Sequence, residues 1–160
     1  KNFPIREEED EDDAIKIAVD AHKGGTDLSG NRYIMHPLKV MIDIHDNYHG
    51  VQSLDDLMVV AALHDVVEDT EWTLDGLFNI GASRKQIDAI DALTRRDGET
   101  YADFILRCTK NELARIVKFY DCKDNLRPRR IDNLEPEKKA SLRRRYVRAM
   151  EILEPRTEVA

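Results

Sequence analysis

The sequence predicts an all-α protein, and three observations support this fold class. Apolar residues recur at intervals of three and four along most of the 160-residue chain, as they do on the buried face of a helix. Alternating apolar and polar residues, which would indicate strands, are nearly absent. Residues that commonly cap helices precede several of the apolar segments. We therefore expect one compact domain of about six to eight helices, long enough to enclose a hydrophobic core.

The first helix is expected to follow an acidic segment. Residues 7–13 are all acidic, and apolar residues at helical spacing begin at Ala14. A run of like charges is usually solvated, and acidic residues are favourable at the N-terminus of a helix. We therefore predict an acidic, flexible lead-in over residues 1–12 and a single folded domain over residues 13–160. An interaction tail is the alternative interpretation of the acidic run.

A loop and two helices should come next. Residues 24–31 contain three of the seven glycines, which favours a loop able to bend around a ligand. Pro37 suits the first turn of a helix over residues 37–45. Ser53 is a good N-cap for a further helix, whose apolar residues recur at helical spacing as far as His64. His64 is therefore expected to face the core.

The rest of the chain contains signals for five more helices. A short helix should follow Thr73, and Ser83 opens another with a capping box. Thr100 is expected to cap the next one. Two longer helices should span Glu112–Asn125 and about Pro136–Leu153, each with one apolar face. No internal repeat or low-complexity linker interrupts this series, which favours a single domain.

The segment ALHDVVEDT, residues 62–70, carries the most informative group of side chains. Residues four apart share a helix face, so a continuing helix would place Glu68 above His64 and Asp69 above Asp65. Four titratable groups beside the core are costly unless a divalent metal compensates them, with the two spare carboxylates handling water and protons. The alternative is a helix end that becomes polar at the protein surface.

Two other segments make a metal site the better interpretation. YIMHP, residues 33–37, supplies His36, and VKFYDCKDNL, residues 117–126, supplies Asp121. Asp121 follows Val117 at helical spacing, which would put a carboxylate in the interior, where a lone charge is costly. Two imidazoles and two carboxylates from three helices form a mixed donor set that suits a divalent ion and leaves positions for water and substrate.

Through these three motifs the chain resembles the HD-domain metal-dependent phosphohydrolases, and in particular the small stand-alone alarmone (ppGpp) 3′-pyrophosphohydrolases. The resemblance covers roughly residues 13–153. It implies a compact helical fold of the HD type and four metal ligands, namely His36, His64, Asp65 and Asp121. It further implies that Glu68 and Asp69 position or activate the attacking water. Asn125 would contact the ribose or phosphate region, and Tyr146 would contact the nucleotide.

The chain departs from the family pattern around the nucleotide. Members of the family carry a basic residue shortly before the YI-HP motif, whereas Asp27 stands near that position here. Lys23 and Arg32 are the basic residues available to replace it, and His22 is a third candidate. Family members also tend to have His or another uncharged residue where Asp124 stands. The resemblance therefore implies the metal ligands more completely than it implies the residues that contact the substrate.

Several other basic residues have two interpretations. Arg95 and Arg96 follow an expected helix end, so they either grip phosphate oxygens or neutralise the helix C-terminus. Lys118 lies three residues before Asp121 and either reaches a phosphate or, as we favour, is solvated at the surface. Residues 127–130 and 138–145 are rich in Lys and Arg, but no aromatic residues interleave them and the net charge is −7. A solvated face or a homo-oligomer contact is therefore favoured over nucleic-acid binding.

The expected cofactor is one divalent ion, with Mn²⁺ favoured over Fe²⁺, Zn²⁺, Co²⁺ and Ni²⁺. Cys108 and Cys122 lack the spacing of a zinc site, so we interpret them as reduced thiols of a cytoplasmic protein. No run of 18 apolar residues is present, and we expect no membrane-spanning segment. The partner that the resemblance implies is a small nucleotide substrate.

Three functions remain in competition. The first is removal of the 3′-pyrophosphate from ppGpp-type alarmones, which gives GDP and pyrophosphate. The second is hydrolysis of another nucleotide or phosphate ester, suggested by the missing basic residue near Asp27. The third is a catalytically silent nucleotide-binding or antitoxin-like partner. Glu68 and Asp69 argue against the third function, because a protein that only binds a nucleotide has no need of acids that handle water.

Overall fold

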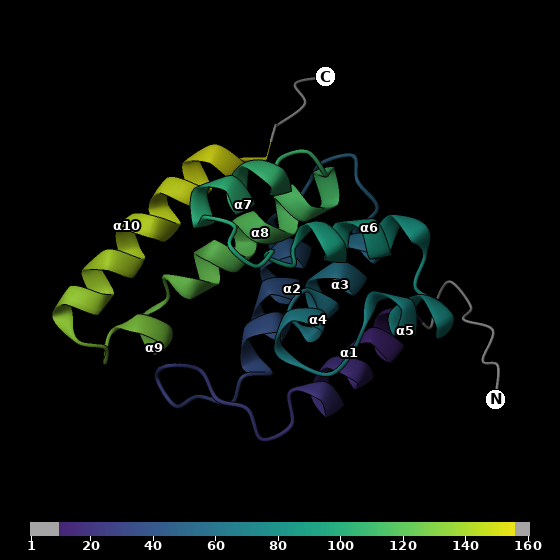
Figure 1. Ribbon diagram of the computed structural model, residues 1–160, viewed down its shortest axis with the longest axis horizontal. Coiled ribbons are helices and arrows are strands. Elements are labelled where there is room, and N and C mark those ends of the chain that lie inside the picture. Colours follow the sequence, from purple (N-terminus) through teal and green to yellow (C-terminus); the bar gives the residue numbers. More distant parts are fainter. Residues whose placement is uncertain (1–9, 156–160) are drawn as a thin grey trace.

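The structure is a computed structural model that describes residues 10–155 (Figure 1). These residues form ten helices and contain no β-strand, so the all-α prediction is confirmed. The helices are α1 Asp10–Ala21, α2 Met35–Asn47, α3 Leu54–Leu63, α4 Val66–Asp69, α5 Leu74–Asn79, α6 Arg84–Ala92, α7 Tyr101–Cys108, α8 Glu112–Asn125, α9 Pro128–Ile131 and α10 Pro136–Leu153. The expected range of six to eight helices was exceeded because α4 and α9, which have four residues each, are too short to show an apolar period.

Helix α3 lies at the centre of the molecule and, from Leu57 onward, is buried on all sides. Residues 57–63 are each at most 3% exposed, and helices α1, α2, α6 and α8 pack against them. A helix that is covered all round has no polar face, so its buried residues extend beyond the predicted apolar stripe. The C-terminal end of α3 consequently delivers His64 into the protein interior, where it is 2% exposed.

The other long helices surround this centre. Helix α8 packs against α2, α3, α6 and α10. Figure 1 shows α10 along one side of the molecule, with α1 and α5 on the opposite side. The three elements that carry the expected metal ligands are therefore α2, the end of α3 and α8, which contact one another directly.

The predicted helix starts are confirmed by side-chain caps. The hydroxyl oxygens of Ser53, Thr73 and Thr100 each accept a hydrogen bond from a backbone N–H in the first turn of the following helix. Ser83 and Gln86 form the complete capping box, with bonds of 3.1 and 3.0 Å between each backbone nitrogen and the other residue's side chain. Each such cap contributes on the order of 1 kcal/mol to helix stability.

The first helix begins earlier than expected. Helix α1 starts at Asp10, inside the segment that we predicted as a lead-in over residues 1–12. Acidic residues in a first helical turn interact favourably with the positive end of the helix dipole, so the acids at positions 10–13 suit this start. Residues 1–9 lie outside the described part of the chain, and the flexible character predicted for them remains a prediction.

The expected continuous helix through residues 62–70 is wrong. Helix α3 ends at Leu63, His64 and Asp65 form a turn, and the separate helix α4 begins at Val66. The imidazole Nδ1 of His64 donates a hydrogen bond of 2.6 Å to the carbonyl oxygen of Ala61, and this side-chain bond competes with the helical backbone bonds of the same turn. Asp69 still follows Asp65 by one helical turn, because its backbone N–H donates to the Asp65 carbonyl oxygen at 2.9 Å.

The loop between α1 and α2 is organised by Asp27. Its carboxylate accepts hydrogen bonds from the backbone nitrogens of Ser29 and Asn31, at 3.0 and 2.9 Å. The amide of Asn31 donates to the carbonyl oxygen of Arg129 at 2.7 Å, and the guanidinium of Arg130 lies 3.4 Å from Asp27. Asp27 therefore holds this loop together and fixes it to α9.

The two cysteines are buried in the core and are free thiols. Desolvation raises the pKa of Cys122 to about 12 and that of Cys108 to about 11. Both are therefore protonated at neutral pH and pack as small apolar residues. Within residues 10–155, no helix combines the length and the apolar character needed to cross a membrane.

Candidate metal centre

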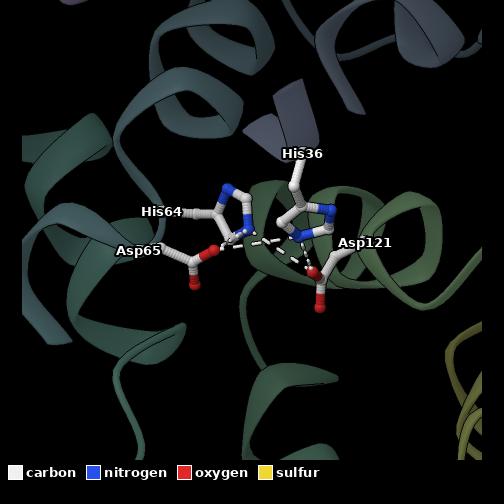
Figure 2. Close-up of side chains that lie close together, drawn as sticks. All are labelled: His36, His64, Asp65 and Asp121. Carbon is white, nitrogen blue, oxygen red and sulfur yellow. Dashed lines mark hydrogen bonds and ion pairs between the residues drawn. The ribbon is translucent and has the colours of Figure 1, made fainter. Parts of the chain in front are cut away.

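The four residues expected to bind metal meet at one point in the interior. His36 comes from α2, His64 and Asp65 come from the turn between α3 and α4, and Asp121 comes from α8. One nitrogen or oxygen atom from each of them lies within 4.8 Å of all the others. Figure 2 shows these four side chains pointing toward one another from three parts of the chain. The chain thus brings together residues that are up to 85 positions apart.

His64 presents a free nitrogen to this point. Its Nδ1 donates to the Ala61 carbonyl oxygen, so the lone pair of the neutral ring is on Nε2. Nε2 is buried and makes no hydrogen bond of acceptable geometry within the described residues, although Asp65 Oδ2 lies 3.0 Å away. A buried nitrogen without a partner is costly, and a metal ion would satisfy it.

His36 is oriented in the same way. Its Nδ1 donates to Asp124 Oδ2 at 2.6 Å, which turns Nε2 toward Asp121 Oδ1, 2.7 Å away. His36 is only 1% exposed, and its ring lies edge-on to that of His64 with 5.4 Å between the ring centroids. In both rings Nδ1 is held by an oxygen acceptor and Nε2 faces the carboxylates, which is the usual orientation of metal-binding imidazoles.

The electrostatics of the cluster require a positive charge. Burial opposes ionisation of Asp121, but the Lys118 ammonium and the bond with His36 hold its pKa well below the ordinary value. Burial also opposes ionisation of Asp65, whose pKa is nevertheless lowered by the imidazole of His64. Burial alone would lower the pKa of His64, but Asp65 and Asp121 raise it well above the ordinary value. Two ionised carboxylates therefore share this small space and attract positive charge, which a proton on His64 supplies without metal and which a divalent ion would replace.

Lys118 supplies part of that positive charge, contrary to our expectation of a solvated side chain. Its Nζ donates to Asp121 Oδ2 at 2.5 Å, and the side chain is only 13% exposed. The ammonium lies 5.1 Å from the centre of the Phe104 ring, a cation–π contact that helps to offset its desolvation. Lys118 is buried because α8 turns it toward the same face as Asp121, three residues later.

Tyr33 and His22 also belong to the site. Tyr33 was not identified from the sequence, and His22 was considered only as a replacement for the basic residue expected near Asp27. The Tyr33 hydroxyl donates to Asp65 Oδ2 at 2.6 Å, and the His22 ring packs on Tyr33 with 4.8 Å between centroids. Burial lowers the pKa of His22, which keeps this ring neutral. Tyr33 could have been found because it lies in the YIMHP motif, three residues before His36. No motif in the sequence predicted that His22 would pack on Tyr33.

Glu68 and Asp69 lie in α4, next to the metal ligands but closer to solvent. Both residues are exposed. Desolvation, followed by the charges of Asp65 and Glu68, raises the pKa of Asp69 to about 6. Desolvation and Asp65 raise the pKa of Glu68 in the same way. These two acids therefore feel the charge of the ligand cluster and hold protons more tightly than ordinary carboxylates.

This arrangement fits a divalent metal ion. The donor set combines two imidazole nitrogens with two carboxylates, which suits ions such as Mn²⁺, Fe²⁺ and Zn²⁺. The buried nitrogen of His64 that has no hydrogen-bond partner is the observation that an ion would explain most directly. His36, His64, Asp65 and Asp121 are the residues that would hold it.

Asn125 and Tyr146 line one small cavity. It is also bordered by Asp27, Arg130 and Ile131, and its volume is about 40 Å³. That volume is well below the several hundred Å³ of ordinary ligand pockets, so this cavity alone does not accommodate a nucleotide. Burial and the charge of Asp121 raise the pKa of Tyr146, which places the phenol within the electrostatic reach of the metal ligands.

The remaining candidates for substrate binding differ in their surroundings. Lys23 and Arg32 are exposed on the loop between α1 and α2, and neither forms an ion pair with the described residues. Arg96 donates to the carbonyl oxygens of Asp91 and Thr94, both at 3.0 Å, which supports its interpretation as a helix C-terminal charge. Arg95 lies 5.8 Å from the centre of the Tyr101 ring.

The basic residues after α8 are engaged within the protein. Arg127 pairs with Asp43 and Asp124 at 2.8 Å in each case, and Arg129 lies 3.0 Å from Asp124. The expectation of a solvated face or an oligomer contact is therefore wrong for these two residues. Sequence reasoning missed their role because their partners come from other parts of the fold.

Comparisons with known proteins found relatives that are named as ppGpp 3′-pyrophosphohydrolases. A guanosine-3′,5′-bis(diphosphate) 3′-pyrophosphohydrolase of Haemophilus influenzae is 34% identical over 136 residues, which are 77% of this chain and 19% of that protein. The bifunctional (p)ppGpp synthase/hydrolase SpoT of Escherichia coli K12 is 30% identical over 154 residues, which are 89% of this chain and 20% of that protein. No protein-family model matches. The chain spans about a fifth of the length of these curated relatives.

A solved structure shares the fold of this chain. It is described as a metazoan ortholog of SpoT that hydrolyses ppGpp, and it superposes with a TM-score of 0.73 at 17% identity. The match covers 96% of this chain and 89% of that one, so the helical fold is shared. The sequence relatives confirm the resemblance to the ppGpp 3′-pyrophosphohydrolases, and this structure adds the shared fold.

Proposed function

Since the chain is related in sequence to ppGpp 3′-pyrophosphohydrolases, we propose that it removes the 3′-pyrophosphate from a ppGpp-type alarmone in a metal-dependent reaction. The observation that carries this proposal is the meeting of four nitrogen and oxygen donors within 4.8 Å, beside two acids. Hydrolysis of this bond in ppGpp consumes one water and yields GDP and pyrophosphate. The proposed ion is Mn²⁺, because the donor set combines imidazoles with hard carboxylates.

A divalent ion at this site would lower the pKa of a bound water toward neutrality and polarise a phosphoryl oxygen. Asp69, with its pKa raised to about 6, is ionised at neutral pH yet basic enough to accept a proton from the attacking water. Glu68 is the second candidate for this role. Tyr33 and Lys118 hold Asp65 and Asp121 in place through bonds of 2.6 and 2.5 Å.

The nucleotide would extend from the metal ligands toward α10. Asn125 follows Asp121 by one turn of α8, and Tyr146 shares a cavity with it. Arg95 and Arg145 lie 5.8 and 4.7 Å from the centre of the Tyr101 ring, and Lys118 lies 6.0 Å from it. These cations provide positive charge on one side of the metal ligands for phosphate groups. Lys23 and Arg32 remain candidates for contacting the base from the loop.

Hydrolysis of a nucleotide panel tests this proposal. Metal-stripped protein would be incubated with ppGpp, pppGpp and other nucleotides, with and without added Mn²⁺, and the products would be resolved by ion-exchange chromatography. We expect ppGpp to be converted to GDP and pyrophosphate only when metal is present. The matched control is Asp65→Asn, which keeps the shape of a ligand but removes its charge, and which should be inactive. Persistence of ppGpp with metal-loaded protein would refute the assignment of the substrate.

A second function is favoured by one observation. Asp27, which stands where relatives of this type carry a basic residue, is committed to the loop through its bonds with Ser29 and Asn31. The base would then lack one of its contacts, and a different nucleotide or phosphate ester would be the substrate of the same metal centre. Cleavage of another compound in the panel, with ppGpp left intact, would support this second function.

A further inference from the structure

Asp124 is a buried carboxylate that is not one of the four expected metal ligands. It lies three residues after Asp121 in α8 and is 0% exposed. Its Oδ2 accepts a hydrogen bond of 2.6 Å from Nδ1 of His36. Its Oδ1 accepts bonds from Arg127 at 2.8 Å and from Arg129 at 3.0 Å. A buried charge is tolerated only when it is paired, and these three donors pair it on both oxygens.

We propose that Asp124 is a positioning residue for the metal ligand His36, and that Arg127 and Arg129 hold Asp124 in place for this purpose. This inference rests on the proposed metal-dependent function. A carboxylate on one imidazole nitrogen fixes the tautomer and the rotation of the ring, and it increases the electron density on the other nitrogen. With Nδ1 bonded to Asp124, the nitrogen presented to the metal ligands is Nε2, which lies 2.7 Å from Asp121 Oδ1.

The arginines also link the helices that carry the ligands. Arg127 binds Asp124 of α8 through Nη1 and Asp43 of α2 through Nη2, at 2.8 Å in each case. His36 belongs to the same helix as Asp43, and Asp121 belongs to the same helix as Asp124. The guanidinium therefore bridges the two helices on which His36 and Asp121 are carried.

Asp43 provides a matched control for this proposal. It is buried like Asp124, at 5% exposure, and it shares the Arg127 guanidinium. It forms no bond with His36 or with any other metal ligand among the described residues. Asp43→Asn would therefore weaken the same arginine bridge without removing the acceptor of the imidazole. A difference between the variants at positions 124 and 43 isolates the contact with the ring.

The experiment measures metal affinity rather than activity. Wild type, Asp124→Asn, Asp124→Ala and Asp43→Asn would be stripped of metal and titrated with Mn²⁺ against a chromophoric chelator. We expect Asp124→Ala to bind Mn²⁺ about 10- to 100-fold more weakly, as is typical when the outer partner of a metal-binding histidine is lost. Asp124→Asn should be intermediate, because its amide oxygen can still accept from Nδ1. Asp43→Asn should bind nearly as tightly as wild type while melting at a lower temperature.

A second readout does not depend on metal. The proton on Nδ1 of His36 should give a strongly deshielded imidazole N–H signal in the NMR spectrum of the metal-free protein. This signal should be present in Asp43→Asn and lost or shifted upfield in Asp124→Asn. Because Asp124→Asn is nearly isosteric with the wild type, it tests the positioning role even if Asp124→Ala fails to fold.

The outcomes separate this inference from the proposed function. Unchanged Mn²⁺ affinity in both Asp124 variants, or an equal loss in Asp43→Asn, would overturn the positioning role even if wild type hydrolyses ppGpp. The expected pattern of affinities combined with no hydrolysis of ppGpp would uphold the positioning role and refute the proposed substrate. A wild-type protein that binds no Mn²⁺ would overturn both.

Discussion

Replacing Asp69 with Asn should make the metal-free protein more stable at neutral pH. The pKa of Asp69 is raised from 3.8 to about 6 by desolvation and by the charges of Asp65 and Glu68. For an acid, a raised pKa in the folded state means that the ionised form is stabilised less by the folded protein than by the unfolded chain. The resulting penalty is fully present above pH 6, declines as the pH falls, and disappears below the ordinary pKa.

The size of this penalty follows from the shift. Each pKa unit corresponds to about 1.4 kcal/mol, so a shift of roughly two units sets an upper bound of about 3 kcal/mol. Because the side chain of Asp69 is exposed, solvent screening reduces this to about 1 kcal/mol. Asp69→Asn should therefore raise the free energy of unfolding by about 1 kcal/mol at pH 7.5 and leave it nearly unchanged at pH 4.

Urea denaturation in the presence of a chelator measures this effect. Wild type and Asp69→Asn would be unfolded at pH 4 and pH 7.5, with Asp88→Asn, an exposed aspartate in α6, as the control for removing one surface charge. Added Mn²⁺ should reduce the advantage of Asp69→Asn, since a cation offsets the negative charges around Asp69. A gain of the same size at both pH values, or no gain at pH 7.5, would refute the electrostatic reasoning.

Three further predictions concern the same centre. His64→Ala should abolish metal loading and turnover together, and metal-dependent turnover at the wild-type rate would remove His64 from the ligand set. Glu68→Gln should bind metal normally but hydrolyse substrate about 10²- to 10⁴-fold more slowly, and an unchanged rate would leave Glu68 with only a structural role. Lys118→Met should lower the stability of the metal-free protein by about 3 kcal/mol, because Asp121 loses a buried partner. Unfolding experiments should show that added metal recovers part of this loss.

Most of the fold could be predicted because local signals fix it. Helices α8 and α10 have the predicted bounds, Glu112–Asn125 and Pro136–Leu153, since each combines an apolar period with a clear start. The break after Leu63 could not be predicted in this way. No Gly or Pro marks it, and His64 and Asp65 keep right-handed helical backbone angles. It accompanies the bond between the His64 side chain and the Ala61 carbonyl, which depends on where the ring points.

The candidate site also contains residues that could be predicted from local signals and residues that could not. The four expected ligands meet as the motifs suggested, because His and Asp next to apolar positions are conspicuous in the sequence. Lys118 and Arg127 could not be assigned, because a basic residue on a helix is usually solvated. Only the packing of α8 against its neighbours turns Lys118 onto Asp121 and brings Arg127 to Asp43. The partners that support the ligands are thus a property of the tertiary fold.

The charges around the site explain how an acidic protein could bind a highly anionic substrate. The chain has a net charge of −7, which would repel a nucleotide carrying several phosphates. Near the ligands, however, Lys118 opposes the carboxylates of Asp65 and Asp121, and a divalent ion would offset most of the negative charge that remains, including that of Glu68 and Asp69. The carboxylate of Asp124 adds little negative charge to the site, since the guanidinium groups of Arg127 and Arg129 neutralise it. Attraction of the phosphates would then depend on the metal, and removing it should weaken substrate binding as well as stop hydrolysis.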